Sequence, residues 1–121
     1  MTNIIKTTKT GSSAIISGTI TAGTKAASGD NTLVAAPASG YRLVIKGWHV
    51  QNESSTATTT LLKDGASSTL YRYLAQNQGD GIGRVYEQGF ELRLTAATAL
   101  ILNLSGANSH GYWVEYWTEA V

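Results

Sequence analysis

The sequence predicts an all-β fold, a single-domain antiparallel β-sandwich or barrel. Short segments in which apolar and polar residues alternate recur along the chain, as they do in half-buried strands. Polar turns that contain glycine separate these segments at regular distances, which is typical of sandwiches and barrels. The chain of 121 residues has the size of one domain and is long enough to bury its own core.

The N-terminal part of the chain differs from the rest. The first 40 residues contain no aromatic side chain and only one acid, Asp30, and they are mostly Thr, Ser, Ala and Gly with scattered Ile. Because Thr and Ile favour strands, this composition predicts extended structure and not a flexible linker. We therefore divide the chain into an N-terminal extended arm, residues 1–25, and a sandwich, residues 26–121. The arm either adds edge strands to its own sandwich or lies on a neighbouring subunit.

The first strands of the sandwich follow from local patterns. Residues 43–45 are a continuous apolar run, and Gly47 predicts a bulge beyond which Trp48 and Val50 switch faces. The Asp-Gly pair at positions 64 and 65 predicts a hairpin turn. The expected strands lie near residues 4–7, 13–21, 31–36, 42–51, 57–63, 68–74, 85–94, 99–105 and 111–118.

The last strands show the clearest alternation. Residues 90–94 alternate between apolar and charged side chains, and residues 112–117 alternate around Val114. Residues 100–104 place three leucines on one face of a strand. Residues 79–83, Gly-Asp-Gly-Ile-Gly, predict a flexible turn and not a phosphate-binding loop, because no helix follows to supply an anion-binding N-terminus.

Composition excludes several functional classes. The chain has no Cys, which excludes a disulfide scaffold, a thiol nucleophile and a Cys-ligated metal. The net charge of +1 gives no basic patch for nucleic acid. No apolar run approaches the length of a membrane span, and the N-terminus lacks the apolar stretch of a signal peptide. We expect no membrane and no nucleic-acid partner, and a mature chain that begins near Met1 in a cytoplasm.

Catalytic and metal-binding patterns are weak. The sequence lacks a G-x-S-x-G nucleophile elbow. His49 and His110 could meet across strands, but a zinc site needs a third ligand. Asp64 and Asp80 lie in glycine-containing loops, yet Ca²⁺ requires six to eight oxygen ligands. We expect a protein that is not an enzyme and that uses no metal or other cofactor.

The aromatic residues predict an interface. One face of the last strand carries tyrosines and the other carries two tryptophans, so either choice of core leaves large aromatic side chains outside. Only 14% of the residues are charged, against about 25% in typical domains, which favours a surface packed against copies of itself. Either the chain's own arm or another subunit covers these aromatic side chains. The candidate interface residues are Trp113, Trp117, Tyr71, Tyr73 and Arg72, together with Ile4, Ile5 and Lys6 in the arm.

Three segments carry a resemblance to a known group of proteins. Residues 27–36 (ASGDNTLVAA), residues 42–50 with His49, and residues 94–105 (LTAATALILNLS) before a final aromatic strand occur in this order. Together they resemble small structural proteins from the virions of tailed bacteriophages, over roughly residues 26–121. The resemblance implies a jelly-roll-like β-sandwich. It also implies a virion component such as a capsid decoration (cement) protein, a head fibre or part of a tail fibre.

The resemblance sets the functional expectation. We expect a non-enzymatic capsid decoration protein, made in the host bacterial cytoplasm, that binds the major capsid protein on the capsid surface. Cement proteins of this kind are often trimers, so a second partner is the chain itself, as a homotrimer. The alternative is a receptor- or glycan-binding module of a tail fibre or head fibre. The first 25 residues and the 76–83 loop depart from the shorter members of the group, which leaves the position in the virion open.

Overall fold

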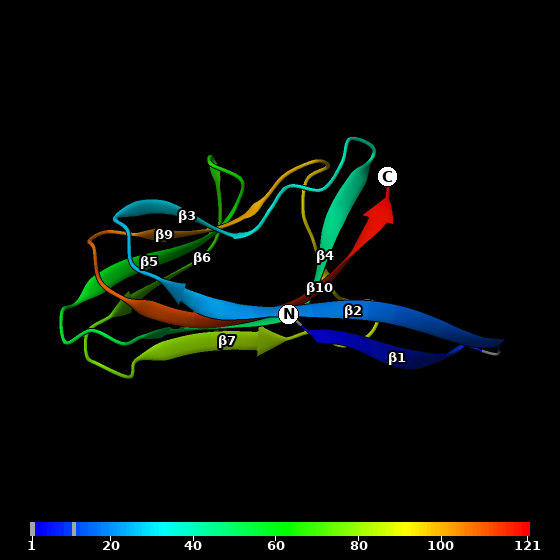
Figure 1. Ribbon diagram of the computed structural model, residues 1–121, viewed down its shortest axis with the longest axis horizontal. Helices are drawn as coiled ribbons and strands as arrows, with labels where there is room; N and C mark the ends of the chain where they lie inside the picture. Colours follow the sequence, from blue (N-terminus) through cyan, green and yellow to red (C-terminus); the bar gives the residue numbers. More distant parts are fainter. Residues whose placement is uncertain (1, 11) are drawn as a thin grey trace.

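Two antiparallel sheets, packed face to face, make up the protein (Figure 1). The computed structural model describes the backbone of residues 2–10 and 12–121 and the side chains of residues 18–121. Within these residues the regular structure is all strand, as the sequence predicts. No helix capable of crossing a membrane occurs in the described part of the chain.

The strands follow one another with short connections. They are β1 (Thr2–Thr10), β2 (Ser12–Lys25), β3 (Gly29–Val34), β4 (Tyr41–Asn52), β5 (Thr58–Asp64), β6 (Ser68–Ala75), β7 (Gly81–Val85), β8 (Leu92–Arg93), β9 (Leu100–Leu104) and β10 (His110–Ala120).

The strand order is that of a jelly roll. One sheet has the order β1-β2-β10-β4-β7, with β8 also paired to β4, and the other has the order β3-β9-β5-β6. Eight strands therefore form two four-stranded layers, β2-β10-β4-β7 and β3-β9-β5-β6, and the chain crosses repeatedly between them, as in a jelly roll. The strands β7 and β6 each lie at one edge of their sheet, and β10 is central to the first sheet.

A bulge in β4 fits two apolar runs to one core. Opposite β10, Ile45 pairs with Tyr116 and Gly47 pairs with Glu115, so β4 carries one extra residue, Lys46. The inward-facing residues of β4 are therefore Leu43 and Ile45 before the bulge and Trp48 and Val50 after it. The face switch predicted at Gly47 is confirmed.

The core lies between the two sheets and draws most strongly on β4 and β9. The three leucines of β9 are each at most 1% exposed, in agreement with the predicted one-sided strand. The Asp-Gly turn is also confirmed, because Gly65 joins β5 to β6 with a positive φ of 69°. The buried apolar core consists of Leu33, Val34, Leu43, Ile45, Trp48, Val50, Leu62, Tyr86, Leu94, Leu100, Leu102, Leu104 and Val114.

The predicted strand at residues 85–94 is wrong. The chain instead forms β7, a turn at residues 87–90, and β8, which has only two residues. Phe90 N donates to the Glu87 carbonyl at 2.9 Å, and Gly89 between them has a φ of 88°, as the third position of a type II turn requires. The predicted flexible turn at residues 79–83 is likewise wrong for its last three residues, which are part of β7.

The N-terminal arm is a β-hairpin that extends the first sheet. Strand β1 pairs with β2 along its whole length, from Thr2 opposite Ile20 to Thr10 opposite Ser12. Only residues 19–25 of β2 also pair with β10. The remainder of the hairpin runs out beyond the sandwich as a two-stranded ribbon, while β4 and β10 turn away from it (Figure 1). The end of β2 at Lys25 coincides with the boundary drawn between arm and sandwich, but residues 19–25 are a full strand of the sandwich sheet.

Candidate functional site

The tryptophans of β10 lie on the outer face of the first sheet. Val114 between them in the sequence is fully buried in the core, so Trp113 and Trp117 point the other way. Both side chains are half-buried. Val44 lies directly opposite Trp117 and is fully buried, although it is not part of the core between the sheets. The indole rings therefore cover part of this outer face and remain partly exposed themselves.

Two of the residues next to Trp113, Ala22 and Gly47, are small. Across the sheet Trp113 lies opposite Ala22 of β2 and His49 of β4, and His49 lies opposite Gly83 of β7. A Cβ atom at Gly47 would come within 3.3 Å of Trp113 Cζ3, so the ring packs against bare backbone. We call the surface formed by Trp113, Trp117, His49 and Ala22 the tryptophan face. Because β2 lies beside β10, residues 19–25 widen this face and do not cover it.

The three candidate residues of β6 divide between its two sides. Tyr71 and Tyr73 are half-buried and face the other sheet: Tyr71 packs against the core, and Tyr73 Oη donates to the Val50 carbonyl at 3.5 Å. Burial raises the pKa of Tyr73. Arg72 is exposed on the opposite side of the strand. These two tyrosines thus stand apart from the tryptophan face.

The remaining candidates lie in the arm. Ile4, Ile5 and Lys6 belong to β1, where they pair with Gly18, Ser17 and Ile16 of β2. Their side chains are outside the described residues, so only their backbone is placed.

The two histidines do not meet. His49 lies on the tryptophan face, whereas His110 is fully buried on the core side of β10. His110 Nδ1 donates to the Asn108 carbonyl at 2.8 Å, and its Nε2 lies 3.3 Å from Thr60 Oγ1. In the described part of the chain, no group of three or more His, Asp or Glu side chains is placed to hold a metal ion.

The loop aspartates stabilise turns. Asp64 accepts hydrogen bonds from the backbone and the hydroxyl of Thr95, at 3.1 and 2.8 Å. Asp80 accepts the backbone N–H groups of Gln76 and Asn77, at 2.9 and 2.8 Å. Their carboxylates therefore fix the backbone of two connections.

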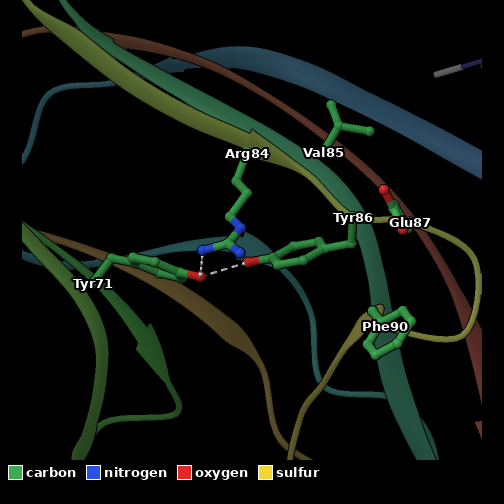
Figure 2. Close-up of a pocket in the computed structure, with 6 residues that line it drawn as sticks. All are labelled: Tyr71, Arg84, Val85, Tyr86, Glu87 and Phe90. Carbon is green, nitrogen blue, oxygen red and sulfur yellow. Dashed lines mark hydrogen bonds between the residues drawn. The ribbon is translucent and has the colours of Figure 1, made fainter.

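A pocket that the sequence did not indicate opens between the edge strands β6 and β7. Its volume is about 520 Å³. Tyr71 comes from β6, Arg84 and Val85 come from β7, and the following turn adds the rest (Figure 2). The lining residues are Tyr71, Arg84, Val85, Tyr86, Glu87 and Phe90.

A chain of hydrogen bonds holds one wall of this pocket. Trp48 Nε1 donates to Tyr86 Oη at 3.2 Å, and the hydroxyls of Tyr86 and Tyr71 lie 3.0 Å apart. Arg84 donates to Tyr71 Oη at 3.5 Å, and its guanidinium carbon lies 5.3 Å from the centre of the Tyr86 ring, a cation–π arrangement. Figure 2 shows the guanidinium and both hydroxyls converging on one point. Burial, followed by the hydrogen bond to Tyr71, raises the pKa of Tyr86 to about 12.

The turn after β7 forms the other wall. Lys46 Nζ donates to the Tyr86 carbonyl, and Tyr86 N donates to the Lys46 carbonyl at 2.9 Å. Gly89 N donates to the Glu91 carboxylate at 3.0 Å. The turn is therefore fixed at both ends, and it presents Phe90 with 76% of its surface exposed.

No protein-family model matches the sequence, and a search of curated proteins gives no match.

Proposed function

We propose that this protein is a non-enzymatic structural component of a bacteriophage virion, a capsid decoration protein that binds the head shell as a homo-oligomer. The jelly-roll topology agrees with the fold that the phage resemblance implies. The observation that carries the proposal is the hairpin arm, which leaves the sandwich and makes no third-strand pairing at residues 12–18 within the described chain.

A lone two-stranded ribbon is a poor structure for a free monomer. An isolated hairpin is at best marginally stable in water, and it gains stability when a third strand or a packed surface joins it. The edge of β1 also offers backbone N–H and C=O groups to a further strand. The arm is therefore suited to lie on capsid subunits or on a neighbouring copy of the chain.

The tryptophan face supplies a second contact. Trp is among the residues most enriched as energetic anchors of protein interfaces. Trp113 lies opposite Ala22 and packs over Gly47, so few neighbouring side chains keep a partner from its indole ring. We assign this face to contacts between copies of the chain, with a trimer as the expected assembly. The three arms of one trimer then bind the capsid at the same time. Such multivalent attachment raises avidity by about 10²–10⁴ over a single contact.

Removal of the arm tests the proposal. The variant begins at Gly18 and retains the part of β2 that pairs with β10. Capsids stripped of the protein are mixed with either chain, sedimented and assayed for bound protein. We expect saturable binding of the full chain and at least about tenfold weaker binding of the shortened chain, because avidity through the arm is lost. Circular dichroism should show the same sheet content in the sandwich.

A control variant shows whether the loss of binding is specific to the arm or follows from any change at the surface. Gln88→Ala changes an exposed side chain in the turn before β8 and should leave capsid binding unchanged. Full occupancy by the shortened chain would reject the role of the arm. Failure of the full chain to bind any capsid would reject decoration, and saturable binding to host cells instead would favour a receptor- or glycan-binding module.

A further inference from the structure

We propose that the pocket between β6 and β7 binds an acidic saccharide, a sugar residue that carries a carboxylate group. This inference goes beyond capsid decoration and does not depend on it. It rests on one cation, one exposed aromatic ring and two hydroxyls that the fold holds in fixed positions around the same pocket.

Arg84 is the cation of the pocket, and it has no carboxylate partner among the described residues. Arg42 and Arg93, in contrast, both pair with Glu119, at 2.6 and 3.3 Å. Arg84 is instead held by a tyrosine hydroxyl and the face of a tyrosine ring, which orient the guanidinium without neutralising it. A planar guanidinium forms paired hydrogen bonds with a carboxylate, so a carboxylate ligand completes this site.

Phe90 is the platform for a sugar ring. It is the most exposed large apolar side chain in the described part of the chain. Its turn is fixed by the hydrogen bond to Glu87 and by the positive φ of Gly89, so its position is set before a ligand binds. The face of an aromatic ring is electrostatically negative and attracts the C–H groups on the apolar face of a pyranose.

The remaining polar groups match the hydroxyls of a sugar. Burial raises the pKa of Tyr86 to about 12, so its hydroxyl stays protonated at neutral pH. The hydroxyl of Tyr71 lies 3.0 Å from it, on the same wall of the pocket. Figure 2 places Glu87 on the far side of Tyr86 from Arg84. The pocket thus has a cationic end for a carboxylate and an anionic end that accepts hydrogen bonds from hydroxyls. Its volume of about 520 Å³ lies in the usual range for small-ligand sites, about 300–1,000 Å³.

Titration with trigalacturonic acid tests this site on the full chain. Backbone amide shifts of the isotope-labelled protein report where the saccharide binds. We expect saturable shifts at Arg84, Tyr86 and Phe90. The fully methyl-esterified trisaccharide should bind about tenfold more weakly, because it keeps the rings but loses the charge that pairs with the guanidinium.

Variants assign the binding to the two walls. Arg84→Gln should weaken binding about tenfold, and Phe90→Ala, at a largely exposed position, about fivefold. Arg72→Gln is the matched control, because it removes an exposed arginine one residue from Tyr71 on the other side of β6. It should leave the affinity unchanged.

Four results would overturn the proposal. These are no saturable shift with the wild-type chain, unchanged affinity in Arg84→Gln, equal affinity for the methyl ester, and equal affinity for acetate alone. Equal affinity for the methyl ester would mean that the site binds neutral sugars. Equal affinity for acetate would mean that it binds simple anions. The Arg84→Gln variant should bind capsids normally. Failure of the saccharide proposal would therefore leave the proposed decoration role intact.

Discussion

At the scale of single residues, Tyr86 connects the core to the pocket. Its hydroxyl accepts from Trp48 Nε1, which is buried, and contacts the hydroxyl of Tyr71. The rings of Trp48 and Tyr71 also pack together, with centres 5.1 Å apart. A single oxygen therefore satisfies a buried indole N–H and fixes the edge strand β6 against β4.

Tyr86→Phe should destabilise the fold by about 1–3 kcal/mol, because it leaves the Trp48 N–H buried without an acceptor. Urea unfolding followed by circular dichroism measures the loss as a lower midpoint with an unchanged slope. Tyr41→Phe is the control at an exposed tyrosine and should shift the midpoint little. Equal effects of the two variants would mean that the Trp48–Tyr86 hydrogen bond contributes nothing to stability.

Glu119 gives the fold a dependence on acid. Its hydrogen bond from Arg42, followed by that from Arg93, lowers its pKa below the ordinary 4.5. A lowered folded-state pKa means stability that is complete above about pH 4.5 and is lost as the pH falls through the folded value. Glu119→Gln should therefore cost up to about 1 kcal/mol at pH 7 and less at pH 3. Urea midpoints at both pH values, with Glu87→Gln as the control, would refute this if the cost did not shrink in acid.

At the scale of elements, local chemistry explains which strands the sequence could predict. The bulge in β4 was predictable because Gly47 stands between two apolar runs of opposite phase, and β9 was predictable because its leucines alternate. The alternation at residues 90–94 predicted a strand that the structure lacks. Gly89 has a positive φ and belongs to a turn, and this turn points Phe90 to solvent. A two-residue pairing with β4 replaces the long strand.

Strand β7 should depend on its glycines. A Cβ atom at Gly83 would lie 2.8 Å from the Trp48 carbonyl oxygen and 2.8 Å from His49 Cδ2, so Gly83→Ala forces β7 away from β4. We expect a loss of about 1–3 kcal/mol and faster hydrogen exchange of the β7 amides.

Gly23→Ala is the control for this strand effect. Its added Cβ would lie 3.4 Å from Tyr112 Oη, an ordinary contact near the end of β2. The change in stability should stay within about 0.5 kcal/mol. Protection of the β7 amides that survives Gly83→Ala would show that the sheet edge adjusts to the extra carbon without separating.

At the scale of the whole molecule, the topology decides what the sequence could not show. The pocket joins Tyr71 to Arg84, and these two residues lie near each other in the chain but on edge strands of different sheets. Alternation assigns a residue to a face of its own strand, and it does not say which two sheet edges meet. For β10, in contrast, the alternation predicted that large aromatic side chains stay outside the core, but it left open whether these are the tyrosines or the tryptophans. The structure places Val114 and the tyrosines on the core side and the tryptophans outside.

The tryptophan face leads to a prediction about the mass in solution. Two half-exposed indole rings on one side of β10 favour contact between copies, and a trimer would bury these rings. We expect light scattering coupled to size exclusion to give about 38 kDa, three times the chain mass of 12.8 kDa.

Substitutions on this face give the prediction its control. Trp113→Ser combined with Trp117→Ser should shift the mass to that of a monomer, because it removes both anchors while Val114 stays in the core. Arg72→Gln, on the outer side of the other sheet, should leave the mass unchanged. A wild-type monomer would mean that the capsid itself must drive any assembly. A trimer that survives loss of both tryptophans would move the subunit contact to the arm, whose edge strand offers the other free surface.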